Sequence, residues 1–144
     1  MKNVVCPSCR AVNRADETRL AKAVCGKCAT PLIGGKVLHL DAALFDRLLA
    51  QDGLPLVVDF WAPWCGPCRA MAPAFEEAAS QLAPWVRLGK VDTEKEQALG
   101  ARFQVQSIPT LVLFRHGREL DRLPGARPAR DIVAWVRRRL GQVG

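Results

Sequence analysis

All six cysteines of this chain fall into three Cys-x-x-Cys pairs: Cys6 with Cys9, Cys25 with Cys28, and Cys65 with Cys68. Two cysteines at this spacing can bind one metal ion together, or can close one intramolecular disulfide. The sequence begins MKNVV, without the apolar stretch of a secretory signal, and thiols in the cytosol are kept reduced. We therefore expect metal binding or redox exchange, rather than three structural disulfides.

The first two pairs have the spacing C-x2-C-x15-C-x2-C, which is typical of zinc sites with four thiolate ligands. Residues 1 to about 30 lack a sustained helical or strand period, so this segment cannot build an apolar core unaided. PLIGG, at 31–35, has the composition of a linker. We predict that residues 1–35 form a small zinc-ribbon-like module and its linker. One structural Zn²⁺ per chain would be bound by Cys6, Cys9, Cys25 and Cys28.

The sequence leaves other roles open for these four cysteines. They could form redox-active pairs or disulfides, or hold an iron–sulfur cluster, and oxidation could release a bound metal and change the activity. The module is also basic, which is compatible with a nucleic-acid adaptor. However, residues 1–30 contain no aromatic side chain that could stack on bases, and the net charge of +7 is spread along the chain. We favour a structural metal site without nucleic-acid binding.

From Lys36 onward, strand-like and helix-like segments alternate, which predicts an α/β fold in residues 36–144. The expected strands are 36–40, 54–62, 86–92, 110–115 and 118–124, and the expected helices are 41–52, 65–82, 94–103 and 129–140. Pro73 should bend the second helix, because proline removes one backbone hydrogen bond. The apolar run at 54–63 is about half as long as a membrane span, so we expect a soluble, cytoplasmic chain without membrane contact.

The third cysteine pair lies where an apolar strand meets a helix, in the segment FWAPWCGPC. Unpaired N–H groups and the dipole at a helix N-terminus stabilise a thiolate, so Cys65 is the expected attacking sulfur. Cys68 can close a disulfide with it and is the expected resolving sulfur. A lone Cys-x-x-Cys also suits a metal. Redox exchange is favoured here because His39 and His116 are remote in sequence and the other four cysteines already complete one metal site.

VVDFWAPWCGPC, followed in order by KVD, SIPTLVLF and PGA, resembles the thioredoxin family over residues 36–144. With the four N-terminal cysteines, the chain is similar to the zinc-containing bacterial thioredoxin 2 subfamily. The resemblance implies a thioredoxin fold, a central mixed β-sheet flanked by helices, and activity as a protein-disulfide reductase. It also implies disulfide-containing client proteins and re-reduction by an NADPH-dependent thioredoxin reductase. In this superfamily, a Gly-Pro pair between the two cysteines, as in CGPC, is typical of reductases. The alternative function within the superfamily is that of an oxidase or isomerase.

The resemblance also implies roles for residues outside the cysteine pair. Asp59 matches a buried carboxylate that accepts a proton from the resolving cysteine, and Lys90 matches its partner. A hydrogen-bonded structural carboxylate and a surface strand residue are the respective alternatives. Pro109 matches a proline that follows a cis peptide bond. The expected substrate-contacting residues are Trp64, Gly66, Pro67, Ile108, Pro109, Gly125 and Ala126. Nothing in the sequence requires more than a monomer.

Overall fold

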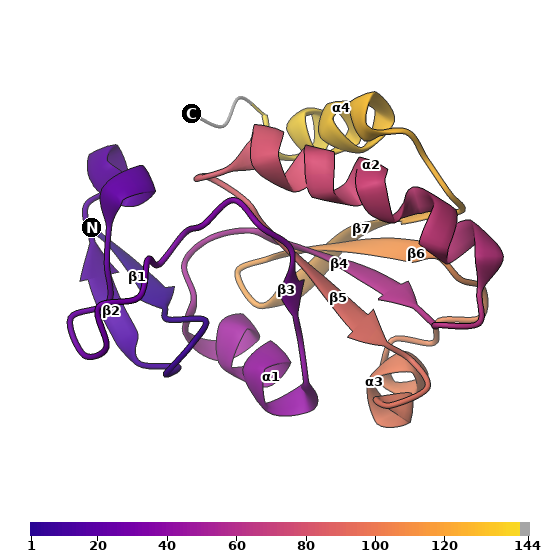
Figure 1. The fold of residues 1–144 in the computed structure, drawn as a ribbon, viewed down its shortest axis with the longest axis horizontal. Coiled ribbons are helices and arrows are strands. Elements are labelled where there is room, and N and C mark those ends of the chain that lie inside the picture. Colours follow the sequence, from indigo (N-terminus) through magenta and orange to yellow (C-terminus); the bar gives the residue numbers. More distant parts are fainter. Residues whose placement is uncertain (142–144) are drawn as a thin grey trace.

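The computed structural model describes residues 1–141 and contains a two-stranded and a five-stranded sheet (Figure 1). The strands of the larger sheet, in spatial order, are β3 (Leu38–His39), β5 (Arg87–Asp92), β4 (Leu56–Trp61), β6 (Thr110–Arg115) and β7 (Arg118–Pro124). The first three are parallel to one another, whereas β6 runs antiparallel to both β4 and β7. The sheet is therefore mixed, as expected.

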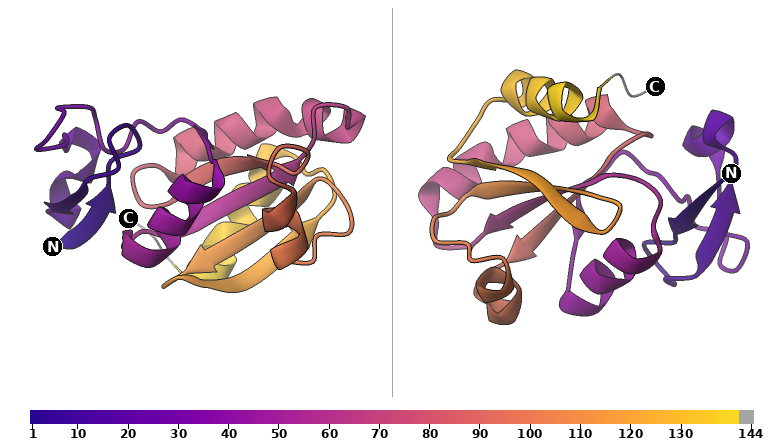
Figure 2. Two further views of the ribbon diagram at one scale, coloured as in Figure 1. Left: turned by 90° about the horizontal axis from the view of Figure 1, so that it is seen from below. Right: turned by 180° about the vertical axis from the view of Figure 1, so that it is seen from behind.

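Helices cover both faces of this sheet. They are α1 (Ala42–Gln51), α2 (Gly66–Leu82), α3 (Gln97–Arg102) and α4 (Ala129–Leu140). Figures 1 and 2 show α2 and α4 on one face, and α1 and α3 on the other. Successive residues of β4 alternate between the two cores: Val57 packs with the α2 and α4 side chains, and Val58 with those of α1. The apolar run, in which Asp59 is the one charged residue, thus reflects burial on both faces.

The elements expected from the sequence are present, with shorter ends. The first strand of the main sheet covers only Leu38–His39 of the expected 36–40, and α3 covers 97–102 of the expected 94–103. Asp41 caps α1 by accepting a hydrogen bond from the Leu44 N–H at 2.7 Å. Within residues 1–141, no helix combines the length and the apolar character that a membrane crossing requires.

The first 35 residues, which we call the leader, are more regular than the sequence suggests. They form an antiparallel pair, β1 (Lys2–Val5) and β2 (Val12–Ala15), followed by a 3-10 helix, η1 (Glu17–Lys22). The sequence predicted a small module here but not its strands, because four-residue strands are too short to show a period. The expected linker, residues 31–35, is also packed against the rest of the protein. Its Leu32 is buried in one cluster with Leu20 of the leader and Leu54, which lies beyond the linker.

We call residues 36–141 the main domain. A division of the chain near residue 35 is a proposal, supported by β3 joining the main sheet at Leu38. Residues 142–144, the end of the expected 36–144 domain, lie outside the described residues.

Gly89 of β5 lies where a side chain does not fit. A Cβ atom built there would be 2.6 Å from Leu40 Cδ1 and 2.9 Å from Leu40 Cγ. We expect Gly89→Ala to lower the free energy of unfolding by about 1–3 kcal/mol, because the buried Leu40 must move. Urea unfolding would measure this. Gly100→Ala is the control, since the nearest atom to an added Cβ is 3.6 Å away. Equal stabilities of the two variants would contradict the prediction.

Candidate functional site

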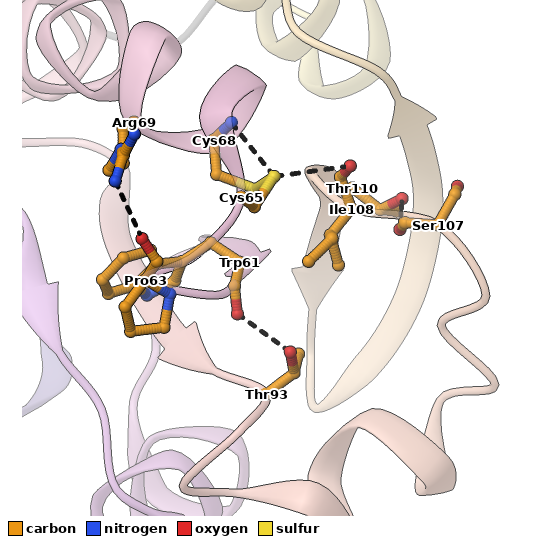
Figure 3. Close-up of a disulfide and its surroundings, with 9 residues drawn as sticks. All are labelled: Trp61, Pro63, Cys65, Cys68, Arg69, Thr93, Ser107, Ile108 and Thr110. Atoms are coloured by element: carbon orange, nitrogen blue, oxygen red, sulfur yellow. Dashed lines mark hydrogen bonds between the residues drawn. A yellow bond between two sulfur atoms is a disulfide. The ribbon is translucent and has the colours of Figure 1, made fainter.

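Cys65 and Cys68 form a disulfide at the N-terminus of α2 (Figure 3), with their Cα atoms 5.3 Å apart. Cys65 is the residue that caps the helix, and its backbone is extended (φ −83°, ψ 110°). The Cys68 N–H donates to Cys65 Sγ at 3.2 Å. After reduction, this donor and the positive end of the helix dipole would stabilise a negative charge on Cys65 Sγ.

The two cysteines differ in their access to solvent. Cys65 is 5% exposed and Cys68 is fully buried, whereas the neighbouring Trp64 is 68% exposed. Gly66 and Pro67, between the two cysteines, are also exposed. A partner molecule can therefore approach the outer sulfur, that of Cys65, across an exposed rim.

A second loop faces the redox turn. The Ile108–Pro109 peptide bond is cis, which confirms the expectation, and the Ile108 carbonyl oxygen lies 3.8 Å from Cys65 Sγ (Figure 3). The Gly125 N–H donates to the Pro109 carbonyl at 2.9 Å, which joins a third loop to the second. Gly125 and Ala126 in that loop are exposed. The tertiary structure thus brings the 107–109 loop and, through it, the Gly125 loop to the disulfide.

Asp59 lies on β4, the strand that leads into the redox turn. Its side chain is fully buried, and neither carboxylate oxygen has a hydrogen-bond partner within the described part of the chain. Burial disfavours the charged form and raises the pKa of Asp59 from 3.8 to about 7, although the opposite charge of Lys90 counteracts this. This environment does not match a hydrogen-bonded structural carboxylate. It provides a group that exchanges protons near neutral pH.

Lys90 is the direct cross-strand neighbour of Asp59 in the register of β4 and β5. Its side chain is partly exposed, and Nζ lies 4.3 Å from the centroid of the Trp61 ring. This position gives a cation–π contact with Trp61 and places a positive charge near the buried carboxyl group. Lys90 is therefore more than an ordinary surface residue of the strand.

The four remaining cysteines come together on two turns of the leader. All four sulfur atoms lie within 4.8 Å of one another. Two pairs join opposite turns, with Cys6 and Cys28 Sγ atoms 3.6 Å apart and Cys9 and Cys25 Sγ atoms also 3.6 Å apart. In a tetrahedral site with Zn–S bonds of about 2.3 Å, sulfur atoms are about 3.8 Å apart. The donor set and its spacing fit a zinc ion, and these cysteines are not joined by disulfides.

The comparison with protein families matches residues 36–138 to the thioredoxin family model. The chain belongs to the thioredoxin family. The four-cysteine cluster in its leader supports assignment to the zinc-containing thioredoxin 2 subfamily. As a family member with its redox disulfide formed, the chain is a thiol–disulfide oxidoreductase, a protein-disulfide reductase of the thioredoxin type.

Comparisons with individual thioredoxins support this assignment. The chain is 40% identical over 140 residues to thioredoxin C-3 of Corynebacterium nephridii, with 96% of each chain covered. It is 38% identical over 101 residues to a thioredoxin of Haemophilus influenzae, covering 70% of this chain and 94% of that one. The solved structure of a Malassezia sympodialis thioredoxin has a TM-score of 0.66 and 28% identity, covering 74% and 93%. The first of these matches includes most of the leader.

Two supporting residues of the cysteine cluster were missed in the sequence. Asn13 on β2 accepts from the Gly26 N–H at 2.9 Å, and its own amide lies 3.5 Å from Cys25 Sγ. Thr30 Oγ1 lies 3.2 Å from Cys28 Sγ. Both contacts orient the second cysteine turn. The cysteine spacing carries no signal for Asn13, which comes from a strand before that turn, and a threonine near a cysteine is too common to indicate a role.

Proposed function

We propose that this protein reduces disulfides of client proteins by dithiol–disulfide exchange at Cys65 and Cys68. The observation that carries the proposal is the disulfide at the start of α2, with Cys65 as its outer, helix-capping sulfur. The Cys65 thiolate attacks one client sulfur, forms a mixed disulfide and releases a client thiolate. The Cys68 thiolate then attacks Cys65 Sγ, which releases the second client thiolate and restores the Cys65–Cys68 disulfide.

Asp59 is the proposed proton acceptor in the second step. Cys68 is fully buried, so its thiol has to lose its proton inside the protein before it can attack. A buried carboxyl group with a pKa of about 7 can accept that proton at neutral pH. Lys90 assists by stabilising the carboxylate, since its positive charge lowers the pKa of Asp59.

Client segments are proposed to bind on the rim around Cys65. Trp64 offers exposed aromatic area, and the Ile108 carbonyl is a hydrogen-bond acceptor beside the reacting sulfur. The remaining contacts would come from the exposed residues Gly66, Pro67, Gly125 and Ala126, and from the backbone of Pro109, which is otherwise buried. Because much of this rim is backbone, it suits extended segments of many different sequences.

We further propose that an NADPH-dependent thioredoxin reductase restores the dithiol and that the protein works as a monomer in the cytoplasm, where NADPH is available. In the leader, Cys6, Cys9, Cys25 and Cys28 would hold one structural Zn²⁺. That ion would supply folding free energy to a segment with a very small apolar core.

Insulin reduction tests the proposed function. With thioredoxin reductase and NADPH, the chain should sustain catalytic NADPH consumption, and the same mixture without the chain is the control. The Cys65/Cys68 couple should have a reduction potential near that of thioredoxins, about −270 mV. Isomerases lie at about −180 mV and DsbA-type oxidases at about −120 mV, so the potential distinguishes the three classes. A potential at or above the isomerase value, with no NADPH consumption, would show that the proposal is wrong.

A further inference from the structure

The residue before the first leader cysteine is held on both sides by the main domain. The Val5 N–H donates to Asp52 Oδ1 at 2.7 Å, and the Val5 carbonyl accepts from Arg87 Nη2 at 2.7 Å. Val5 itself is fully buried. These partners are 47 and 82 residues away in the sequence, so the contacts are purely tertiary.

Asp52 and Arg87 also form an ion pair with each other. Arg87 Nε and Asp52 Oδ2 are 3.2 Å apart, and their side chains are only 4% and 2% exposed, respectively. A buried ion pair is favourable only when further hydrogen bonds satisfy its charged groups. One such hydrogen bond on each side chain comes from Val5. The ion pair therefore depends on β1 for one hydrogen bond to each of its two side chains.

The surrounding contacts place β1 between two cores. Val4 packs in the leader cluster, whereas Val5 packs with Phe45 and other side chains on the α1 face of the main sheet. The Gly53 N–H donates to the Asn3 carbonyl at 2.7 Å, directly after the end of α1. Figures 1 and 2 show the leader beside α1, at the opposite end of the main domain from the N-terminus of α2.

We propose that the Asp52–Arg87 pair is a clamp that positions Cys6 for the metal, so that metal retention by the leader and stability of the main domain are coupled through Val5. Cys6 follows Val5 directly, and its carbonyl closes the first cysteine turn by accepting from the Arg10 N–H at 3.0 Å. A shift of Val5 would move the first ligand away from the other three sulfurs. By linkage, a bound metal stabilises the clamp as much as the clamp stabilises the bound metal. Asp52 and Arg87 are positioning residues: among the described residues their hydrogen bonds go to the Val5 backbone rather than to a sulfur atom, although the charge of Arg87 also interacts with Cys6.

The zinc-loaded full chain provides the test. The measurement is the rate at which zinc passes to a metallochromic chelator, under conditions where circular dichroism shows a folded protein. Asp52→Asn removes the charge that pairs with Arg87, and Arg87→Lys removes the donor to the Val5 carbonyl. We expect zinc release to be about 10-fold faster in both variants, at the lower end of the roughly 10- to 100-fold loss of metal affinity that follows removal of a group bonded to a metal ligand, because Asp52 and Arg87 act through the residue before the ligand. If one variant does not fold, the other provides the measurement.

Two controls separate positioning from general destabilisation. Asp46 of α1 forms an exposed ion pair, 2.7 Å long, with Arg102 of α3, and Asp46→Asn should leave the release rate within about twofold of wild type. Val136→Ala leaves a cavity in the core on the α2 and α4 face of the sheet, a cluster that does not include Val5, so it should release zinc more slowly than a clamp variant of equal melting temperature. The gain in melting temperature on zinc loading should also be smaller in the clamp variants than in wild type.

Wild-type release rates in both folded clamp variants would overturn the coupling. The same conclusion would follow if Val136→Ala released zinc as fast as the clamp variants at matched stability. A wild-type chain that retains no zinc would overturn this inference together with the proposed metal site. None of these three results bears on the proposed reductase activity, because that activity is tested by a different assay, insulin turnover.

Discussion

Replacing Cys65 with serine should reduce insulin turnover on the order of a thousandfold or more, because the first step depends on a thiolate at this position. Cys65 is the more exposed of the two sulfurs and accepts the Cys68 N–H hydrogen bond, whereas Cys68 is fully buried. A serine hydroxyl fits the same space but does not ionise near neutral pH, so the local field has no anion to stabilise. NADPH consumption in the coupled assay measures the loss.

Cys68→Ser is the matched partner of this variant, since it removes the same disulfide but leaves the attacking sulfur in place. We expect it to accumulate mixed disulfides between Cys65 and client proteins, visible on non-reducing gels and absent in Cys65→Ser. Trapped complexes in Cys65→Ser but not in Cys68→Ser would reverse the assigned roles. Wild-type turnover in Cys65→Ser would remove the mechanism altogether.

Replacing Asp59 with asparagine should stabilise the protein above neutral pH. The pKa of Asp59 is about 7 in the folded state and 3.8 ordinarily, so between these values the folded protein holds a proton that the unfolded chain has lost. Folding stability therefore falls as the pH rises through this window and is lowest above pH 7, where a charge is buried. Three pKa units correspond to about 4 kcal/mol, which is the upper limit of the gain in the variant.

Urea unfolding of oxidised wild type and Asp59→Asn measures this gain. The difference between the two proteins should be much larger at about pH 8 than at about pH 4, where wild-type Asp59 is already largely neutral. Asp121→Asn is the control. The hydrogen bond from Trp135 lowers the pKa of Asp121 below its ordinary value of 3.8, so replacing this carboxylate should cost nearly the same stability at about pH 8 and at about pH 4, and less only at lower pH. A pH-independent effect of Asp59→Asn would show that this carboxyl group does not titrate as described.

Asp59→Asn should also slow the second step of the exchange, in which Cys68 attacks the mixed disulfide at Cys65. Without the proposed proton acceptor, mixed disulfides should persist longer by about tenfold or more, in line with a contribution of about 10²- to 10⁴-fold from general base catalysis. Stopped-flow measurement of client release at about pH 7 would show this. An unchanged rate would mean that another group takes the proton.

Most of the main domain could be predicted from local patterns. The apolar run around β4 indicated a strand buried on both faces, and Asp59 was recognisable as a charge inside it. Strand β3 came out shorter than expected because its length depends on pairing with β5, which involves only Leu38 and His39. In the leader, β1 and β2 were missed because each has four residues and mixed burial.

The cysteine spacing and the CGPC turn determined the chemistry of this protein from the sequence alone, because ligand geometry and helix capping are local properties of a few consecutive residues. Only the tertiary structure showed that the Ile108 carbonyl lies 3.8 Å from the redox sulfur, and that Asp52 and Arg87 hold Val5 beside the four-cysteine cluster. These contacts join residues 43 to 82 positions apart. No local pattern encodes such partners, because packing of the whole sheet and its helices decides which distant groups meet.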